Sequence, residues 1–284
     1  MNYNKKFLIT PGNSIRLSDF DPKFTGNHKN KKSAMPEIRK LKHRMDELQY
    51  SLYAENKHSL LIILQAPDAG GKDGVVRHVI GAMNPQGCRV VSFKEPSAME
   101  LTHDFLWRIK SQTPRPGEVV IFNRSQYEDV LIVRVHNLVP EEVWSGRYGK
   151  INDFEQQLIA NDTHILKFFL HISKKEQLRR FRQRLNDPSR LWKISEADYT
   201  ERIYWNDYEA AYESALSKCS TSDAPWYIIP SDHKWFRDLA ISQIIVETMK
   251  KLDIQIPEPT VNISRIRTEY HEAADKKKNS GSKK

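Results

Sequence analysis

Cysteine and long apolar runs are both scarce in this chain of 284 residues. Its two cysteines, Cys88 and Cys219, stand alone, which indicates neither a disulfide framework nor a zinc site and fits a reducing compartment. The longest apolar runs are too short to span a bilayer. The segment after Met1 lacks the apolar core and the cleavage site of a secretory signal. We therefore expect a cytoplasmic protein with no membrane partner.

Acidic residues are outnumbered, because 45 lysines and arginines face 36 aspartates and glutamates and leave a net charge of +9. This excess suggests a polyanionic partner, which by charge alone is a nucleic acid, an anionic membrane, a nucleotide or an inorganic polyanion. Part of the charge lies in the lysine-rich segment 276–284, which we expect to be disordered. Charge therefore indicates a class of partner without choosing among its members.

Apolar runs of strand length alternate along the chain with segments of helical periodicity. Strands are predicted at 60–64, 89–93, 118–122, 165–172 and 226–229. Helices are predicted at 38–52, 97–113, 152–159, 174–186, 196–216 and 234–252. This alternation predicts an α/β fold whose mostly parallel sheet is covered by helices on both faces. The strand C-termini of such a sheet share one edge, and ligands bind there.

The two ends of the chain do not follow this alternation. Residues 1–34 mix proline, glycine, asparagine and lysine, and we expect them to form an extended, partly ordered arm. Residues 35–255 form the predicted domain, with a lid at about 174–200, and 256–284 form a partly disordered tail. The chain is thus expected to hold one folded domain between two less ordered ends.

A glycine-rich turn connects the first predicted strand to a helix at residues 65–74, Gln-Ala-Pro-Asp-Ala-Gly-Gly-Lys-Asp-Gly. Strand, glycine loop, lysine and helix is the order that aims backbone N–H groups at phosphate. The P-loop pattern G-x-x-x-x-G-K-[ST] is matched incompletely, since Ala66 replaces its first glycine and Asp73 replaces the hydroxyl that binds Mg²⁺. The alternative is an ordinary turn with a surface lysine. Position and context favour phosphate.

Two side chains of this loop are candidates for chemistry. Lys72 is expected to lie against transferring phosphate oxygens and to neutralise the charge that builds in the transition state. Asp68 would repel phosphate unless a cation lay between them, so we interpret it as a Mg²⁺ ligand that replaces the missing hydroxyl. Alternatively, Asp68 caps the following helix by accepting hydrogen bonds from loop N–H groups.

A second polar group, residues 123–129, follows the third predicted strand. Kinases commonly place a metal-binding aspartate at this point, whereas Asn123 offers only a neutral oxygen. Arg124 suits bidentate binding of phosphate, since its guanidinium is planar. If a helical turn begins at Ser125, Glu128 points back along the same side. The alternative is that Arg124 and Glu128 form a structural ion pair.

A third group is the basic segment 174–193, in which eight lysines and arginines accompany only two acidic residues. The apolar positions Leu178, Phe181 and Leu185 predict a buried stripe on its helix. Arg180 and Arg184, four residues apart, would then lie together on one polar side. The loop that follows would fold over phosphate as a mobile lid. The alternative is a solvated basic face.

Four segments together resemble the polyphosphate kinase 2 family. They are 65–74, 122–131 (Phe-Asn-Arg-Ser-Gln-Tyr-Glu-Asp-Val-Leu), 191–198 (Leu-Trp-Lys-Ile-Ser-Glu-Ala-Asp) and 224–235 (Ala-Pro-Trp-Tyr-Ile-Ile-Pro-Ser-Asp-His-Lys-Trp). The likeness covers roughly residues 15–255 in the order of the family. It implies a P-loop kinase-like three-layer sandwich similar to thymidylate kinase, with a helical lid. The activity implied is phosphoryl transfer between inorganic polyphosphate and nucleotides, dependent on Mg²⁺ with Mn²⁺ as an alternative metal.

The resemblance also implies roles for single residues. Residues expected at the reacting centre are Asp68, Lys72, Arg124, Glu128, Arg180 and Arg184. Residues expected to bind phosphate or nucleotide are Ala69, Gly70, Gly71, Lys72, Asp73, Gly74, Arg77, Arg124, Arg180, Arg184 and Lys193. Residues expected to bind metal are Asp68, Asn123 and Glu128. The form Asn-Arg-Ser-x-Tyr-Glu resembles the subgroup that accepts both AMP and ADP. The implied partners are polyphosphate, adenine or guanine nucleotides and further copies of the chain in a homodimer or homotetramer, with no nucleic acid.

Two other functions are compatible with part of this pattern. An ATP-dependent nucleoside or nucleotide kinase would have serine or threonine after the loop lysine, and Asp73 argues against it. A non-catalytic RNA-binding protein would interleave aromatic residues with basic ones for base stacking. The basic helix has only Phe181, which is assigned to the buried stripe. Phosphoryl transfer therefore explains more of the sequence than either alternative.

Overall fold

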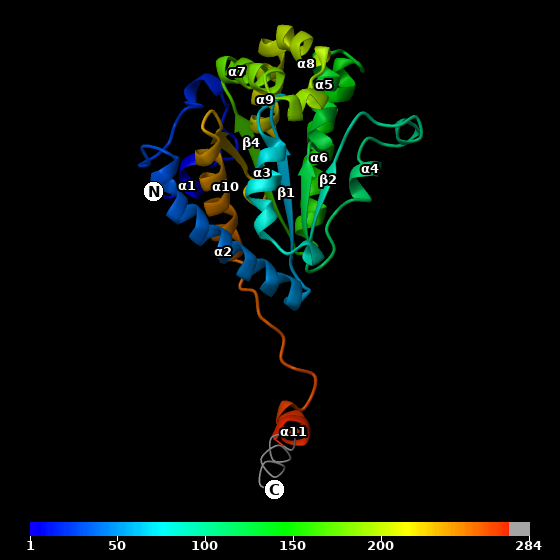
Figure 1. The fold of residues 1–284 in the computed structure, drawn as a ribbon. Helices are drawn as coiled ribbons and strands as arrows, with labels where there is room; N and C mark the ends of the chain where they lie inside the picture. The colour runs from blue at the N-terminus through cyan, green and yellow to red at the C-terminus, as the bar shows by residue number, and fades with distance from the viewer. Residues whose placement is uncertain (273–284) are drawn as a thin grey trace. The chain divides into compact units, whose positions relative to one another are not determined.

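One fully parallel sheet forms the centre of the computed structural model, which describes residues 1–272 (Figure 1). The expected disorder at 276–284 lies outside the described residues. The strands are β1 (Ser59–Gln65), β2 (Cys88–Ser92), β3 (Val119–Asn123), β4 (Thr163–His171) and β5 (Trp226–Pro230). Their order is β2-β3-β1-β4-β5, and every neighbouring pair is parallel. The α/β fold class and the five predicted strands are confirmed.

Helices cover both faces of the sheet, as the apolar strands require. One face packs against α2 (Lys31–Glu55), α3 (Lys72–His78) and α10 (Lys234–Met249), and its buried core continues through all three. The other face packs against α6 (Glu141–Ile159), α9 (Trp205–Lys218) and the residues that precede the short α5 (Ile132–Val135). Strand β1 is buried along its whole length, because it is the central strand and both faces are covered.

The loops that follow the strands gather at one edge of the sheet. Helices α7 (Lys174–Leu185), α8 (Glu196–Thr200) and α9 lie together above this edge, with α5 beside them (Figure 1). The predicted helix 196–216 is interrupted, because a 3-10 turn at Glu201–Tyr204 separates α8 from α9. No helix among residues 1–272 is long and apolar enough to cross a membrane.

The N-terminal residues do not form the extended arm that their composition predicts. They begin with helix α1 (Tyr3–Phe7), and both Tyr3 and Phe7 pack edge-on against Phe236 of α10. Ile9 then donates its backbone N–H to the carbonyl of Trp226. The free energy gained by burying these aromatic and aliphatic side chains exceeds the entropic cost of ordering a polar segment. Residues 1–254 accordingly form one compact unit.

The prediction of one helix over residues 97–113 is also wrong. Ser97 and Glu100 do make the reciprocal hydrogen bonds of a capping box. The chain nevertheless forms only a 3-10 turn at Glu100–Thr102 and the short α4 (Trp107–Lys110), and Leu101 is exposed. A cap satisfies the first N–H groups of a helix but cannot extend it without an apolar face to bury.

The buried stripe of α7 differs from the prediction as well. Phe181 is buried, but the side chains of Leu178 and Leu185 are about half exposed, at 48% and 51%. Gln177 and Arg180 are buried in their place. The helix therefore turns a polar side toward the glycine loop, where those two side chains find backbone carbonyl groups to bind. The separate C-terminal unit, from Gln255, contains the short helix α11 (Ile263–Ile266).

Candidate active site

The glycine loop between β1 and α3 has a backbone that few residues tolerate. Ala69 and Gly71 both lie in the left-handed region, with φ of 57° and 112°. A Cβ atom on Gly71 would stand only 2.0 Å from a guanidinium nitrogen of Arg237. No side chain caps helix α3, whose N-cap is Gly71, so the helix-cap alternative for Asp68 is wrong. The first turn of α3 keeps its backbone N–H groups for a ligand.

Lys72 is not the surface lysine of an ordinary turn. It is 9% exposed, and its Nζ atom donates to the carbonyl of Ala66 at 2.6 Å. Burial lowers the pKa of Lys72, and Arg124 lowers it further, while Asp68, Glu128 and Asp73 act in the opposite direction. A lysine whose pKa is shifted by burial and by specific neighbouring charges is typical of a functional site.

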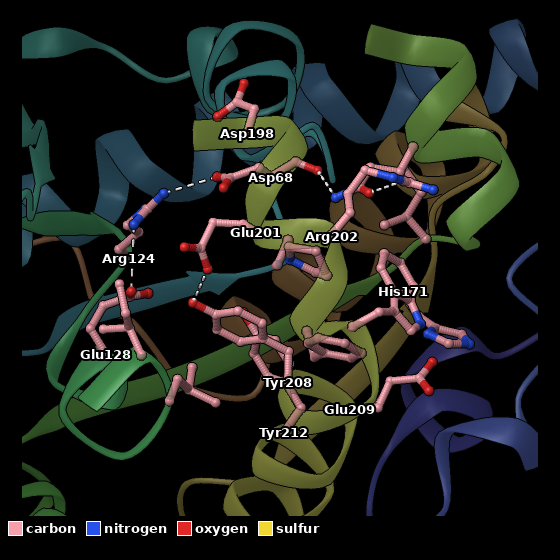
Figure 2. Close-up of a pocket in the computed structure, with 18 of the residues that line it drawn as sticks. Asp68, Arg124, Glu128, His171, Asp198, Glu201, Arg202, Tyr208, Glu209 and Tyr212 are labelled. Carbon is pink, nitrogen blue, oxygen red and sulfur yellow. Dashed lines mark hydrogen bonds and ion pairs between the residues drawn. The ribbon is translucent and has the colours of Figure 1, made fainter. Parts of the chain in front are cut away.

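Asp68, Arg124 and Glu128 meet although they come from three places in the sequence. Nη2 of Arg124 lies 2.9 Å from Oδ1 of Asp68, and Nη1 lies 3.5 Å from Oε2 of Glu128 (Figure 2). Gln65 of β1 donates to the other oxygen of Glu128. Burial disfavours charge on Arg124, but Glu128 and Asp68 outweigh it, so the pKa of Arg124 is raised. The ion pair considered as an alternative thus exists, and it belongs to this cluster.

Asp73 and Asn123 form a different contact. The amide nitrogen of Asn123 donates to Asp73, and Nζ of Lys193 lies 2.9 Å from the other carboxylate oxygen. The bond from Lys193 is the largest of the influences that lower the pKa of Asp73. Lys193 stands at the end of the 3-10 turn Pro188–Lys193, so the loop after α7 reaches the glycine loop as the lid hypothesis requires.

Arg180 and Arg184 are one turn apart on α7 and line the same groove, but they bind different partners. Arg180 is buried and donates to the carbonyl groups of Ala69 and Gly70, and also to that of Ser231 after β5. Arg184 instead pairs with Asp198 of α8 at 3.0 Å. Arg180 thus fixes the backbone of the glycine loop. Arg184 connects α7 to α8.

A basic groove of about 900 Å³ runs along the glycine loop. Its lysines and arginines are Lys72, Arg77, Lys94, Arg124, Arg180, Arg184, Arg190, Lys193, Lys234 and Arg237. Burial lowers the pKa of Lys234, and neighbouring arginines, first among them Arg180 and Arg237, lower it further. So many cations in one groove repel one another, and a polyanion would relieve that repulsion.

A smaller cavity of about 240 Å³ lies on the other side of Asp68 and Arg124, which line both spaces. Its walls are largely apolar and aromatic, with Phe169, Trp205, Tyr208 and Tyr212 among them. Charged groups line it as well, and they include the carboxylates of Asp68, Glu128, Asp198, Glu201 and Glu209. Oε2 of Glu201 accepts hydrogen bonds from Tyr208 (Figure 2) and is 3.0 Å from His136. Such a cavity suits a flat, partly apolar ligand with a few hydrogen-bonding groups.

Several of these residues carry no sequence signal. Arg237 is buried beside the glycine loop and bonded to Asp238, but its sequence position reads as an ordinary helix residue. Tyr208, Tyr212 and Glu201 likewise follow helical periodicity. Only the approach of α9 and α10 to the strand ends brings them to the site.

A parallel sheet with a glycine loop, a buried loop lysine and an arginine-bearing lid defines the P-loop kinase class of phosphotransferases. The family model for polyphosphate kinase 2 matches residues 28–257. The chain therefore belongs to the polyphosphate kinase 2 family.

Individual relatives are similar over nearly their whole length. The AMP/ADP-polyphosphate phosphotransferase of Meiothermus ruber is 47% identical over 263 residues, which cover 92% of this chain and 98% of that protein. The ADP-polyphosphate phosphotransferase of Rhodopseudomonas palustris is 47% identical over 268 residues, with 90% and 93% covered. The crystal structure of polyphosphate kinase 2 from Arthrobacter aurescens is similar with a TM-score of 0.90 at 40% identity, and the match covers 94% of this chain and 96% of that one.

Proposed function

We propose that this protein transfers a phosphoryl group between inorganic polyphosphate and AMP or ADP, forming ADP or ATP, in a reaction that depends on Mg²⁺. The observation that carries the proposal is the pair of spaces that meet at Asp68 and Arg124. One is a basic groove large enough for a chain of phosphates, and the other is an aromatic cavity of the kind that accepts a base. The names of the relatives agree with these two substrates.

The groove is assigned to polyphosphate because of its charge and extent. Polyphosphate carries roughly one negative charge per phosphate and binds through charge along its length. Cations continue past the glycine loop to Lys94, Arg190 and Lys234. The acceptor nucleotide is assigned to the aromatic cavity, so that its terminal phosphate reaches Arg124 and the loop.

The transfer needs no general base. The attacking oxygen belongs to a nucleotide phosphate and is already ionised, and the leaving group is the shortened polyphosphate chain. Lys72 and Arg124 hold the transferring group between donor and acceptor and neutralise its equatorial oxygens. The lid, held to the loop by Lys193 and Asp73, excludes water that would otherwise attack the same phosphorus.

The residues present fit a hard divalent cation shared with the substrates. Residues 1–272 contain no group of three or more His, Cys, Asp and Glu side chains arranged to hold a metal alone. Mg²⁺ commonly takes one or two carboxylates and completes its shell with phosphate oxygens and water, and Asp68 and Glu128 are the carboxylates at this junction. Bound Mg²⁺, or Mn²⁺ in its place, would neutralise phosphate charge. Asn123 is the third proposed ligand, although its amide nitrogen here binds Asp73.

The test is a comparison of substrates. ADP, Mg²⁺ and long-chain polyphosphate should yield ATP, and AMP should yield ADP and then ATP. Guanine nucleotides are assayed in parallel, because the cavity has the size for either purine. ATP with nucleosides or nucleotides in the absence of polyphosphate tests the ordinary kinase, and binding to RNA tests the non-catalytic alternative. Absence of ATP formation from polyphosphate would refute the proposal.

Two further features of the protein are proposed here. A homodimer or homotetramer is supported by large side chains left exposed on α2 and β2, among them Tyr50, Tyr53 and Val90. Sedimentation velocity would measure the mass, and a monomer would refute it. The cytoplasm is the proposed compartment because Cys88 and Cys219 are both free thiols.

A further inference from the structure

A buried ion pair lies beneath the active-site edge, between β4 and α6. Lys167 of β4 is completely buried, and its Nζ atom lies 2.5 Å from Oε2 of Glu155, which is also buried. The same Nζ atom donates to the hydroxyl of Tyr127 at 3.1 Å and to the carbonyl of Cys219. All three N–H bonds of the ammonium group are therefore used.

The other carboxylate oxygen of Glu155 accepts two hydrogen bonds from a single turn. Tyr127 donates its hydroxyl at 2.8 Å, and Gln126 donates its amide nitrogen at 3.1 Å. Both residues belong to the 3-10 helix Gln126–Val130, which also carries Glu128. The hydrogen bonds of Glu155 and Lys167 therefore fix the segment that directly follows Arg124.

The backbone at Arg124 has an unfavourable conformation that its surroundings must stabilise. Arg124 is in the left-handed region with φ of 65°, a conformation that a residue with a side chain seldom adopts unless its surroundings impose it. On one side, its backbone N–H is bound by the carbonyl of Leu64 in β1. On the other side, the buried side chains of Gln126 and Tyr127 are bound by Glu155. Arg124 and Glu128 are therefore held between two fixed anchors.

Stability alone is a weak explanation for the pair. A buried ion pair can often be replaced by apolar side chains without loss of stability, because removal of two charges from water is costly. Lys167 and Glu155 lie in an otherwise apolar core formed by residues such as Phe169 and Trp226. What the pair supplies, and apolar residues would not, is a set of directed hydrogen bonds to the turn.

We propose that Glu155 and Lys167 are positioning residues for phosphoryl transfer, which hold Arg124 and Glu128 in place through Gln126 and Tyr127. The inference rests on the proposed function, since it assigns these residues to the same reaction. Neither residue lines the groove or the cavity, so they act on the rate through the turn and not by contact with substrate.

The main test is Tyr127→Phe, which removes the hydroxyl shared by Glu155 and Lys167 and little volume. We expect kcat to fall about tenfold or more, with KM for polyphosphate within about twofold, because misplacement of a catalytic group affects the transition state more than binding. The matched control is Tyr227→Phe, whose buried hydroxyl binds Asn4 on the opposite face of the sheet. It should leave kcat and KM unchanged. Equal kcat in wild type and Tyr127→Phe would overturn the proposal.

A second pair of variants separates positioning from folding. Glu155→Gln leaves the buried Lys167 without its counter-charge, whereas Glu155→Gln with Lys167→Met removes both charges. We expect the double variant to regain thermal stability but not kcat. Recovery of kcat together with stability would show that the pair acts only on the fold.

Crystal structures of the wild type and of Tyr127→Phe provide a readout that does not depend on activity. We expect the variant to release Arg124 from its left-handed conformation or to shift its guanidinium away from Asp68. An unchanged Arg124 would refute the proposal even if the wild type failed to use polyphosphate, and that failure would separately refute the proposed function.

Discussion

Lys72 shows most directly how the glycine loop positions one of its own side chains. Its ammonium group donates to the carbonyl of Ala66 in its own loop. That contact is available only because the loop turns back on itself at Ala69 and Gly71. A phosphate oxygen is a charged acceptor, so it would bind this ammonium group more strongly than the neutral carbonyl does.

Lys72→Ala should therefore abolish transfer and leave the fold intact. We expect kcat to fall at least about 10²-fold, the usual effect when one donor to a developing charge is removed. Phosphoryl transfer is measured as ATP formed from ADP and polyphosphate, and circular dichroism reports the fold. Lys110→Ala, at an exposed lysine of α4, is the matched control. Turnover near that of the wild type would contradict the phosphate role.

Asp68→Asn tests the proposed metal ligand. The amide keeps the shape of the side chain but loses the charge that attracts Mg²⁺ and pairs with Arg124. We expect the Mg²⁺ concentration for half-maximal activity to rise about tenfold. The exposed Asp153→Asn on α6 is the control. A Mg²⁺ titration identical to that of the wild type would show that Asp68 only pairs with Arg124 and does not bind the metal.

Asp129 makes a prediction about pH. Burial raises the pKa of its carboxyl group to about 6, although Arg147 at 3.0 Å acts in the opposite direction. The folded state therefore holds a proton that the unfolded state has already lost, so this group reduces stability as pH rises from about 4 to 6. Asp129→Asn should lack this contribution. We expect its free energy of unfolding, relative to the wild type, to increase between pH 4 and 7 by up to about 3 kcal/mol. Urea denaturation at several pH values measures the difference, and a constant difference would contradict it.

At the scale of elements, α7 shows that a basic helix can bury part of its polar side. Its polar residues divide into a buried side that binds the glycine loop, through Gln177 and Arg180, and an outer side in solvent. The helix therefore forms a fixed base for the lid. The loop Pro188–Lys193 follows this helix, and the ion pair of Lys193 with Asp73 connects it to the glycine loop.

Lys193→Ala should loosen this loop. The groove loses one cation and the loop loses its ion pair, so we expect KM for polyphosphate to rise about three- to tenfold with a smaller change in kcat. Lys175→Ala, at an exposed lysine of α7, is the control. Equal KM values for the two variants would argue against a lid.

At the scale of the whole molecule, the first residues of the chain complete the core. Tyr3 and Phe7 pack with Phe24 and Phe236 in a cluster of four aromatic rings beneath the glycine-loop face. The N-terminal segment also binds β5 through Ile9. The N-terminal segment is thus part of the folded domain, and its side chains belong to the core on one face of the sheet.

Phe7→Ala should destabilise the protein by about 3–5 kcal/mol, the usual effect of emptying a buried phenylalanine site. Chemical denaturation measures the free energy of unfolding, and Lys5→Ala, at an exposed residue of the same helix, is the control. If Phe7 belonged to a loose arm, both variants would unfold at the same denaturant concentration.

The sequence by itself determined the alternation of strands and helices, the position of the glycine loop and the candidates Asp68, Lys72, Arg124 and Arg180. These follow from local patterns, because the period of apolar residues and the glycine–lysine turn are properties of short segments. Only the tertiary structure decided which of them meet. Asp68 and Arg124 are 56 residues apart, and Lys167 and Tyr127 are 40 apart. Such contacts depend on how helices pack on the sheet, and a buried polar residue carries no periodic signal of the partner that satisfies it.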